Sequence, residues 1–153
     1  MPSSTWVVVA DSSAARIFRA PSPTGALEEI ESYAHAEGRW HENEMRTDEP
    51  GATNDRVGYA KHLTEPRVHP KEHEAISFAR MLNARIEKAR ARNELGRLIL
   101  VAPPEFLGHL RSTMDDDARK LIEGDFNLNL VRMRADEIRR HLPERLYSTI
   151  ATP

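Results

Sequence analysis

The chain has 153 residues and no cysteine, and its 22 lysines and arginines against 24 acidic residues give a formal net charge of −2. The missing cysteines exclude a disulfide scaffold and thiolate metal sites, and the balanced charge means that nucleic-acid binding needs a local basic patch. The apolar runs Trp6–Ala10 and Leu98–Ala102 fall far short of the roughly 20 residues of a membrane span, and no secretory signal opens the chain. We therefore expect a single domain over residues 1–153, cytoplasmic and not bound to membranes.

Three short strands are predicted in the first part of the chain. Trp6–Ala10 is a largely β-branched run that ends at polar turn residues, which is typical of a strand buried on both faces. Ala15–Ala20 is the second candidate, and Pro21–Gly25 predicts a turn after it. We assign Leu27–His35 as the third strand, because a meander suits such short connections.

Residues 35–69 have no hydrophobic period and almost no aliphatic side chains. A loop this long inside a compact domain is uncommon, and such loops are usually functional or disordered. We expect it to be mobile without a partner, because it has too little apolar surface to offset its ordering entropy.

Regular structure is predicted again from Pro70, which suits the first turn of a helix. A helix over residues 70–92 would bury a stripe made of Ala75, Phe78, Ala79, Leu82, Ile86 and Ala89. Leu98–Ala102 then predicts a second buried strand.

The remaining elements are predicted from shorter patterns. They are a helix after Pro103 and Pro104 with Phe106, Leu107, Leu110 and Met114 inside; a short helix capped by Asp115 and carrying Ala118, Leu121 and Ile122; a strand with Phe126, Leu128 and Leu130 on one face; and a helix marked by Ala135, Ile138 and Leu142 and stopped at Pro143.

The order β-β-β-α-β-α-β-α indicates an α/β fold. Strands separated by helices pair in parallel through crossovers, whereas the first three can form an antiparallel meander. We expect a mixed five-stranded sheet of ribonuclease H-like topology, with helices on its faces and with Trp6–Ala10 and Leu98–Ala102 as neighbouring parallel strands.

Asp11 follows the first predicted strand. A carboxylate there could hold Mg²⁺ if further acids, such as Glu31, converged on it. An aspartate before two serines is also typical of an Asx turn. Both interpretations stay open.

His69, His73 and Glu74 form a second candidate metal site. The histidines are four residues apart at the start of the long helix, a spacing that can direct both at one metal. The zinc-protease pattern is not met, because it needs glutamate directly after the first histidine. The alternative is a solvated, acid-rich helix start.

Basic residues could contact RNA at two places. Arg85, Lys88 and Arg92 lie within about 60° of one another on the long helix, where they form either a phosphate-binding patch or an ordinary solvated face. Within residues 35–69, cations and an aromatic ring that could stack on a base occur together, namely Arg56, Tyr59, Lys61 and His62.

Five sequence blocks, spread in order over nearly the whole chain, resemble the bacterial host attachment protein family. The blocks are Trp6–Phe18, Glu37–Arg39, Asp48–Gly51, Pro70–Ala75 and Leu98–Gly108. The family's name implies a role in attaching bacteria to host cells.

That family is in turn similar to bacterial relatives of the middle domain of archaeo-eukaryotic translation release factors. This similarity implies a ribonuclease H-like fold without nuclease activity, and a Gly-Gly-Gln loop before a long helix. Residues 35–69 occupy the corresponding place, but they offer only Gly58, and the chain contains no glutamine.

The resemblance implies a translation-associated factor that binds the ribosome or structured RNA and needs no cofactor. Two alternatives stay open. One is a metal-dependent hydrolase that uses the histidines, and the other is a regulatory domain that affects attachment through a protein partner of residues 35–69.

Overall fold

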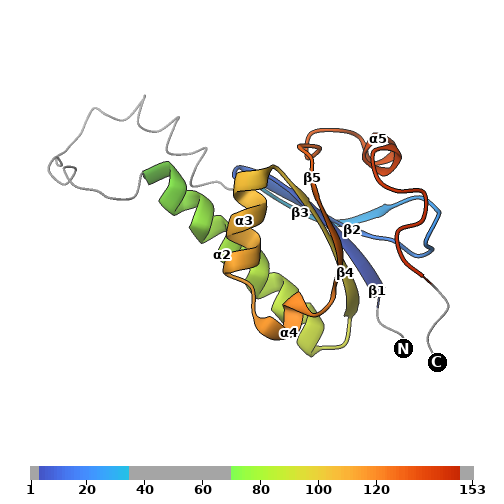
Figure 1. The fold of residues 1–153 in the computed structure, drawn as a ribbon, viewed down its shortest axis with the longest axis horizontal. Helices are drawn as coiled ribbons and strands as arrows, with labels where there is room; N and C mark the ends of the chain where they lie inside the picture. Colours follow the sequence, from blue (N-terminus) through green and yellow to red (C-terminus); the bar gives the residue numbers. More distant parts are fainter. Residues whose placement is uncertain (1–3, 35–69, 149–153) are drawn as a thin grey trace, which may run out of the picture.

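The computed structural model describes residues 4–34 and 70–148. Its elements in chain order are β1 (Ser4–Ala10), β2 (Ala14–Arg19), β3 (Glu28–Ala34), α2 (Pro70–Ala91), β4 (Leu95–Ala102), α3 (Pro104–Ser112), α4 (Asp116–Arg119), β5 (Ile122–Asn127) and α5 (Ala135–Arg140). Within these residues the strands form one sheet in the order β3-β2-β1-β4-β5. Figure 1 shows α2 and α3 on one face of the sheet and α5 on the other.

The strand directions confirm the predicted mixed sheet. β1 and β4 pair in parallel, from Trp6 opposite Leu98 to Val9 opposite Val101, and β4 and β5 are also parallel. β1, β2 and β3 form an antiparallel meander. The two apolar runs of the sequence are therefore neighbouring central strands, as predicted.

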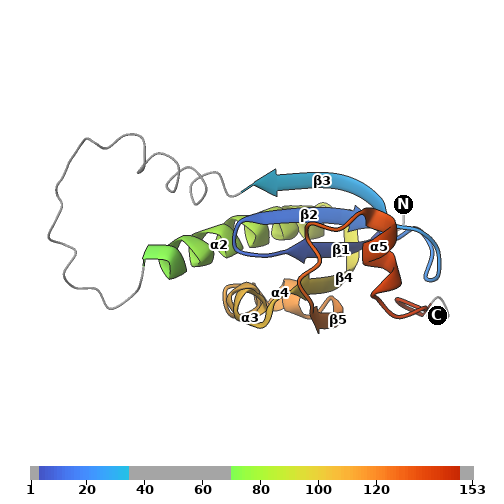
Figure 2. The ribbon, with the colours of Figure 1, turned by 90° about the horizontal axis from the view of Figure 1, so that it is seen from above.

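Two hydrophobic clusters lie on opposite faces of this sheet. Along β1, Trp6 and Val8 belong to the cluster under α2 and α3, whereas Val7 and Val9 belong to the cluster under α5. Figure 2 shows the strands side by side in the order β3, β2, β1, β4, β5. Because both faces are covered, β1 is continuously apolar instead of alternating with polar residues.

The helix α2 has the predicted apolar stripe, and all six of its residues are buried. Asn83 is also buried beside the stripe, and its side-chain amide donates hydrogen bonds to the Leu110 carbonyl at 3.0 Å and to Thr113 Oγ1 at 2.8 Å. This polar contact ties the middle of α2 to the end of α3.

The predicted strand around Phe126 is wrong in its bounds. β5 begins at Ile122 and ends at Asn127, so Leu128 and Leu130 lie beyond it. The reason is the partner strand: β5 pairs with β4 only as far as Ala102, where Pro103 and α3 follow. Leu130 instead packs into the cluster under α5.

Asp115 occupies the N-cap position of α4, as predicted, but its side chain makes no capping hydrogen bond. Its backbone carbonyl accepts a hydrogen bond from the Arg119 N–H at 3.0 Å. Ile122, which was predicted to belong to this short helix, begins β5.

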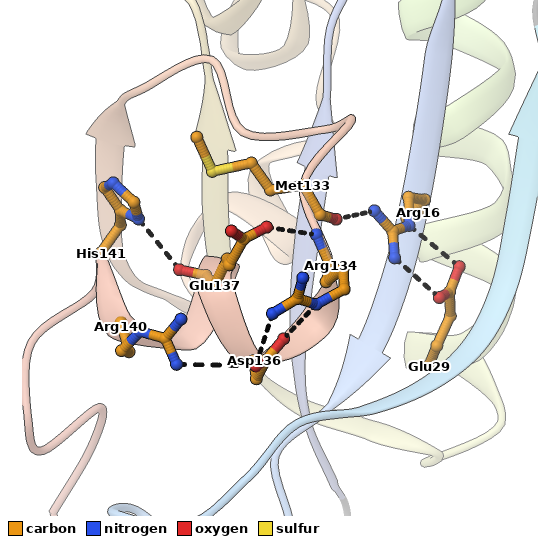
Figure 3. Close-up of polar contacts among 8 residues, drawn as sticks. All are labelled: Arg16, Glu29, Met133, Arg134, Asp136, Glu137, Arg140 and His141. Atoms are coloured by element: carbon orange, nitrogen blue, oxygen red, sulfur yellow. Dashed lines mark hydrogen bonds and ion pairs between the residues drawn. The ribbon is translucent and has the colours of Figure 1, made fainter.

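The segment around α5 is joined to the sheet by an arginine of β2. Figure 3 shows Arg16 between Glu29 of β3 and the backbone carbonyl of Met133, which precedes α5. The Arg16 guanidinium also donates to the Val131 carbonyl at 2.8 Å.

In the described parts of the chain, no helix is both long and apolar enough to cross a bilayer.

Candidate functional site

The strongest candidate site lies where β1 and β4 end. Because these strands are parallel, their carboxyl ends meet at one edge of the sheet, and Asp11 and Pro103 follow them there. Figure 1 shows α2 and α3 beginning at this same end. Two strand ends and two helix starts therefore surround one place.

A cleft of about 450 Å³ opens at this place. It is lined by Asp11, Ser12, Lys71, Glu72, Ala75, Pro103, Glu105, Phe106 and His109. Ala75 and Phe106 are buried and give the cleft an apolar side, whereas Lys71, Glu72 and Glu105 are exposed.

Asp11 closes the turn between β1 and β2. Its Oδ1 accepts hydrogen bonds from the backbone N–H groups of Ser13 and Ala14, at 2.8 and 2.9 Å, and from the Ser13 hydroxyl at 3.1 Å. This geometry is the Asx turn that was one of the two interpretations of Asp11. Glu31, the acid proposed to converge on Asp11, is paired with Arg85 on another part of the sheet.

His109 lies one turn into α3 and lines the cleft. Its Nε2 is buried and has no hydrogen-bond partner among the described residues, and its ring meets Phe106 edge to face, with centroids 6.4 Å apart. A buried polar atom without a partner is uncommon and needs an explanation.

The start of α3 leaves further donors without side-chain partners. Pro103 is the N-cap residue and no side-chain cap is formed. The first backbone N–H groups of a helix have no partner inside the helix, so those of Glu105 and Phe106 are available at the cleft.

The predicted metal site is only partly within the described residues. His73 is exposed on α2 and Glu74 is half-buried, while His69 lies outside the described residues. In residues 4–34 and 70–148, no group of three or more histidine, aspartate or glutamate side chains could hold a metal ion.

Arg85, which was predicted as part of a basic patch, is held by contacts with other residues of the protein. Its guanidinium makes a bidentate ion pair with Glu31 of β3, with 2.6 Å between Nη2 and Oε2, and it lies over the Trp6 ring at 5.2 Å. The Tyr33 hydroxyl donates a hydrogen bond to the same carboxylate. Arg85 therefore ties α2 to the edge strand β3.

These contacts change the acidity of the groups. The hydrogen bond from Arg85 holds the pKa of Glu31 below its ordinary value, against the opposing effect of burial. Burial, followed by the hydrogen bond to Glu31, raises the pKa of Tyr33, and Glu31 raises the pKa of Arg85.

Lys88 and Arg92, the other two members of the predicted patch, are exposed. Their neighbours Arg90 and Arg97 are paired with Glu87 and Glu123, respectively. The predicted RNA-contacting residues in the loop lie outside the described residues; they are Arg56, Gly58, Tyr59, Lys61 and His62.

Ser12, Lys71 and His109 line the cleft but were not predicted from the sequence as site residues. The sequence feature that could have indicated the cleft is the presence of two predicted buried strands that end at turn or proline residues, together with two predicted helix starts. The carboxyl ends of parallel strands are where open α/β sheets bind ligands.

Two comparisons with known proteins do not indicate a family or a function for this chain. No curated protein matches the chain. A solved structure described as "Archaeal protein" is similar with a TM-score of 0.42 and 10% identity, over 80% of this chain and 29% of that one. The chain thus spans less than a third of that protein's length.

A comparison with protein families is informative. The model of a family described as "Protein required for attachment to host cells" matches residues 6–142, from β1 to just beyond α5. The match agrees with the resemblance seen in the five sequence blocks. Because it covers nearly the whole chain, the protein belongs to the family of proteins required for attachment to host cells.

Proposed function

We propose that this protein is a translation-associated factor that binds the ribosome or structured RNA, with a ribonuclease H-like sheet as its scaffold. The observation that supports this function is the exposed pair made by Lys88, in the last turn of α2, and Arg92, directly after that helix. The proposal also draws on the resemblance to release-factor middle domains, and it implies a cytoplasmic location.

The charges on α2 divide into two groups. Arg85 and Arg90 are paired with glutamates and are largely neutralised. Lys88 and Arg92 make no ion pair with a described residue, so their charges are available to phosphates. Since the net charge of the chain is −2, binding depends on such local cations.

The loop residues complete the proposed interface. Tyr59 stacks on a base, while Arg56, Lys61 and His62 contact the backbone near Gly58. The loop joins β3 to the first residue of α2, whereas Lys88 and Arg92 lie at the other end of that helix. In this proposal the loop and the pair Lys88 and Arg92 make two separate contacts with one extended RNA.

A salt series tests this function. Each neutralised phosphate contributes about 0.7 to 0.9 to the slope of log affinity against log salt. The double variant Lys88→Gln/Arg92→Gln should therefore flatten the slope for ribosomes or structured RNA by about 1.5. Tyr59→Ala should instead weaken binding by about 1–3 kcal/mol with little change of slope.

A matched control is available on the other face of the sheet. Arg132→Gln/Arg145→Gln removes two exposed arginines near α5 that make no ion pair with a described residue, and it should leave the slope unchanged. If the wild-type protein fails to bind at low salt, or the Lys88/Arg92 variant keeps the wild-type slope, the RNA proposal is wrong. A regulatory role through a protein partner would then be favoured.

A further inference from the structure

The cleft at the ends of β1 and β4 lies at a reversal in the sheet. After β1 the chain continues into β2 on one side, and after β4 it continues through α3 and α4 into β5 on the other side. In open α/β sheets, ligands bind in the crevice beyond the carboxyl ends of strands at such a reversal. The volume of the cleft, about 450 Å³, suits a small organic ligand.

One side of the cleft offers hydrogen-bond donors without acceptors. They are the first N–H groups of α3, which lack a side-chain cap, and the Lys71 ammonium at the start of α2. The buried Nε2 of His109 has no partner in the described parts of the chain. Together these groups suit one phosphate group.

The rest of the cleft has different chemistry. The carboxylates of Glu72 and Glu105 and the second oxygen of Asp11 can accept hydrogen bonds from hydroxyl groups. Ala75 and Phe106 present apolar surface. With three carboxylates against one lysine, the lining disfavours a ligand whose negative charge extends beyond one phosphate group.

From this combination we infer that the cleft binds a free nucleoside monophosphate. Its phosphate lies at the start of α3 beside Lys71 and His109. Its ribose hydroxyls meet the carboxylates, and its base lies against Phe106 and Ala75. This inference rests on the cleft alone and is independent of RNA binding by Lys88 and Arg92.

Calorimetric titration of the full chain with AMP tests the inference. AMP should bind, and adenosine and inorganic phosphate should each bind at least about tenfold more weakly, because each lacks part of the contacts. ATP should also bind more weakly than AMP, because its extra phosphates approach the carboxylates.

Variants locate the binding to the cleft. Lys71→Gln, at an exposed position, and His109→Ala should each weaken AMP binding about tenfold. Ser12→Trp, also at an exposed position, should abolish it by filling the cleft. Lys120→Gln, an exposed lysine beyond α4, is the matched control and should bind AMP as the wild type does.

Thermal unfolding of each variant shows whether the fold is retained, and Lys71→Gln and Ser12→Trp keep the test valid if His109→Ala is unstable. Absence of AMP binding at millimolar concentrations would overturn the inference. So would binding that Lys71→Gln and Ser12→Trp leave unchanged. Inorganic phosphate that binds as tightly as AMP would reduce the cleft to a simple anion site and would also overturn it.

Discussion

Three arginine side chains of this protein cross-link segments that are distant in the sequence. Arg16 joins β2 to Glu29 and to backbone carbonyls before α5. Arg139 of α5 donates to the carbonyls of Gly25 at 2.8 Å and Pro23 at 3.3 Å. Arg85 joins α2 to β3. Guanidinium groups suit this task, because their five donors can reach several acceptors at once.

The pair of Arg85 and Glu31 should make stability depend on pH. The folded-state pKa of Glu31 lies below its ordinary value of 4.5, so the pair stabilises the fold above that pH. This contribution is lost as pH falls through the folded-state pKa. Glu31→Gln should therefore lower the free energy of unfolding by about 1–2 kcal/mol at pH 7, and by less at pH 3.

Urea denaturation at both pH values measures this difference. Glu144→Gln is the control, because Glu144 is exposed and its side chain makes no ion pair with a described residue. It should change stability little at either pH. An equal loss for Glu31→Gln at pH 3 and pH 7 would show that the charge of Glu31 is not responsible.

The role of Arg85 could not be predicted from its position in the sequence. In the sequence, Arg85 lies off the apolar stripe of the helix. It was therefore grouped with Lys88 and Arg92, as part of either a phosphate-binding patch or a solvated face. Its partner Glu31 is 54 residues away, and only the packing of α2 against the meander brings the two together. Lys88 and Arg92, one turn and two turns further along, do remain exposed.

At the scale of elements, hydrophobic period predicted most of the structure. The stripe of α2 and the apolar runs of β1 and β4 depend on local spacing, and each lies where the sequence placed it. The end of β5 depends on something else, namely where its partner β4 stops. The alternation through Leu128 and Leu130 therefore misled the prediction, because these side chains pack into the cluster under α5 although they lie outside any strand.

The end of α2 makes a further prediction. Asn93 has a φ of 61°, in the left-handed region. The Asn93 and Glu94 N–H groups donate to the carbonyls of Arg90 and Ala89 at 3.0 and 2.9 Å, which is the Schellman pattern. Asn93→Gly should leave stability nearly unchanged, whereas Asn93→Val should lower it by about 1–2 kcal/mol.

Chemical denaturation measures both Asn93 variants. Ala91→Val, at the exposed last residue of α2, is the control, because it keeps helical geometry and costs less than about 0.7 kcal/mol in helix propensity. If Asn93→Val were no worse than Ala91→Val, the left-handed position would not limit the choice of residue.

At the scale of the whole molecule, the cleft was the hardest feature to predict. Its lining comes from the segments that follow β1 and β4 and from the first two turns of α2 and α3. Each segment alone resembles an ordinary turn or helix start. The parallel pairing of β1 with β4 brings the four segments together, so the site becomes visible only once the sheet order is known.

The same sheet forms part of both hydrophobic clusters, and this arrangement should make the described fold unfold as one unit. Leu82 lies in the cluster under α2 and Ile138 in the cluster under α5, and both are fully buried. Each cluster packs on β1 and β4, so loss of either one exposes the strands that support the other. Leu82→Ala and Ile138→Ala should each lower the free energy of unfolding by about 2–5 kcal/mol within a single transition.

Urea denaturation followed by far-ultraviolet circular dichroism and by tryptophan fluorescence tests this cooperativity. The two signals should coincide for the wild type and for both variants. Because the two side chains lie on opposite faces and share no contact, their effects should add in the double variant to within about 0.5 kcal/mol. Two separated transitions, one sensitive to Leu82→Ala and the other to Ile138→Ala, would instead show that the two layers unfold independently, in spite of the strands they share.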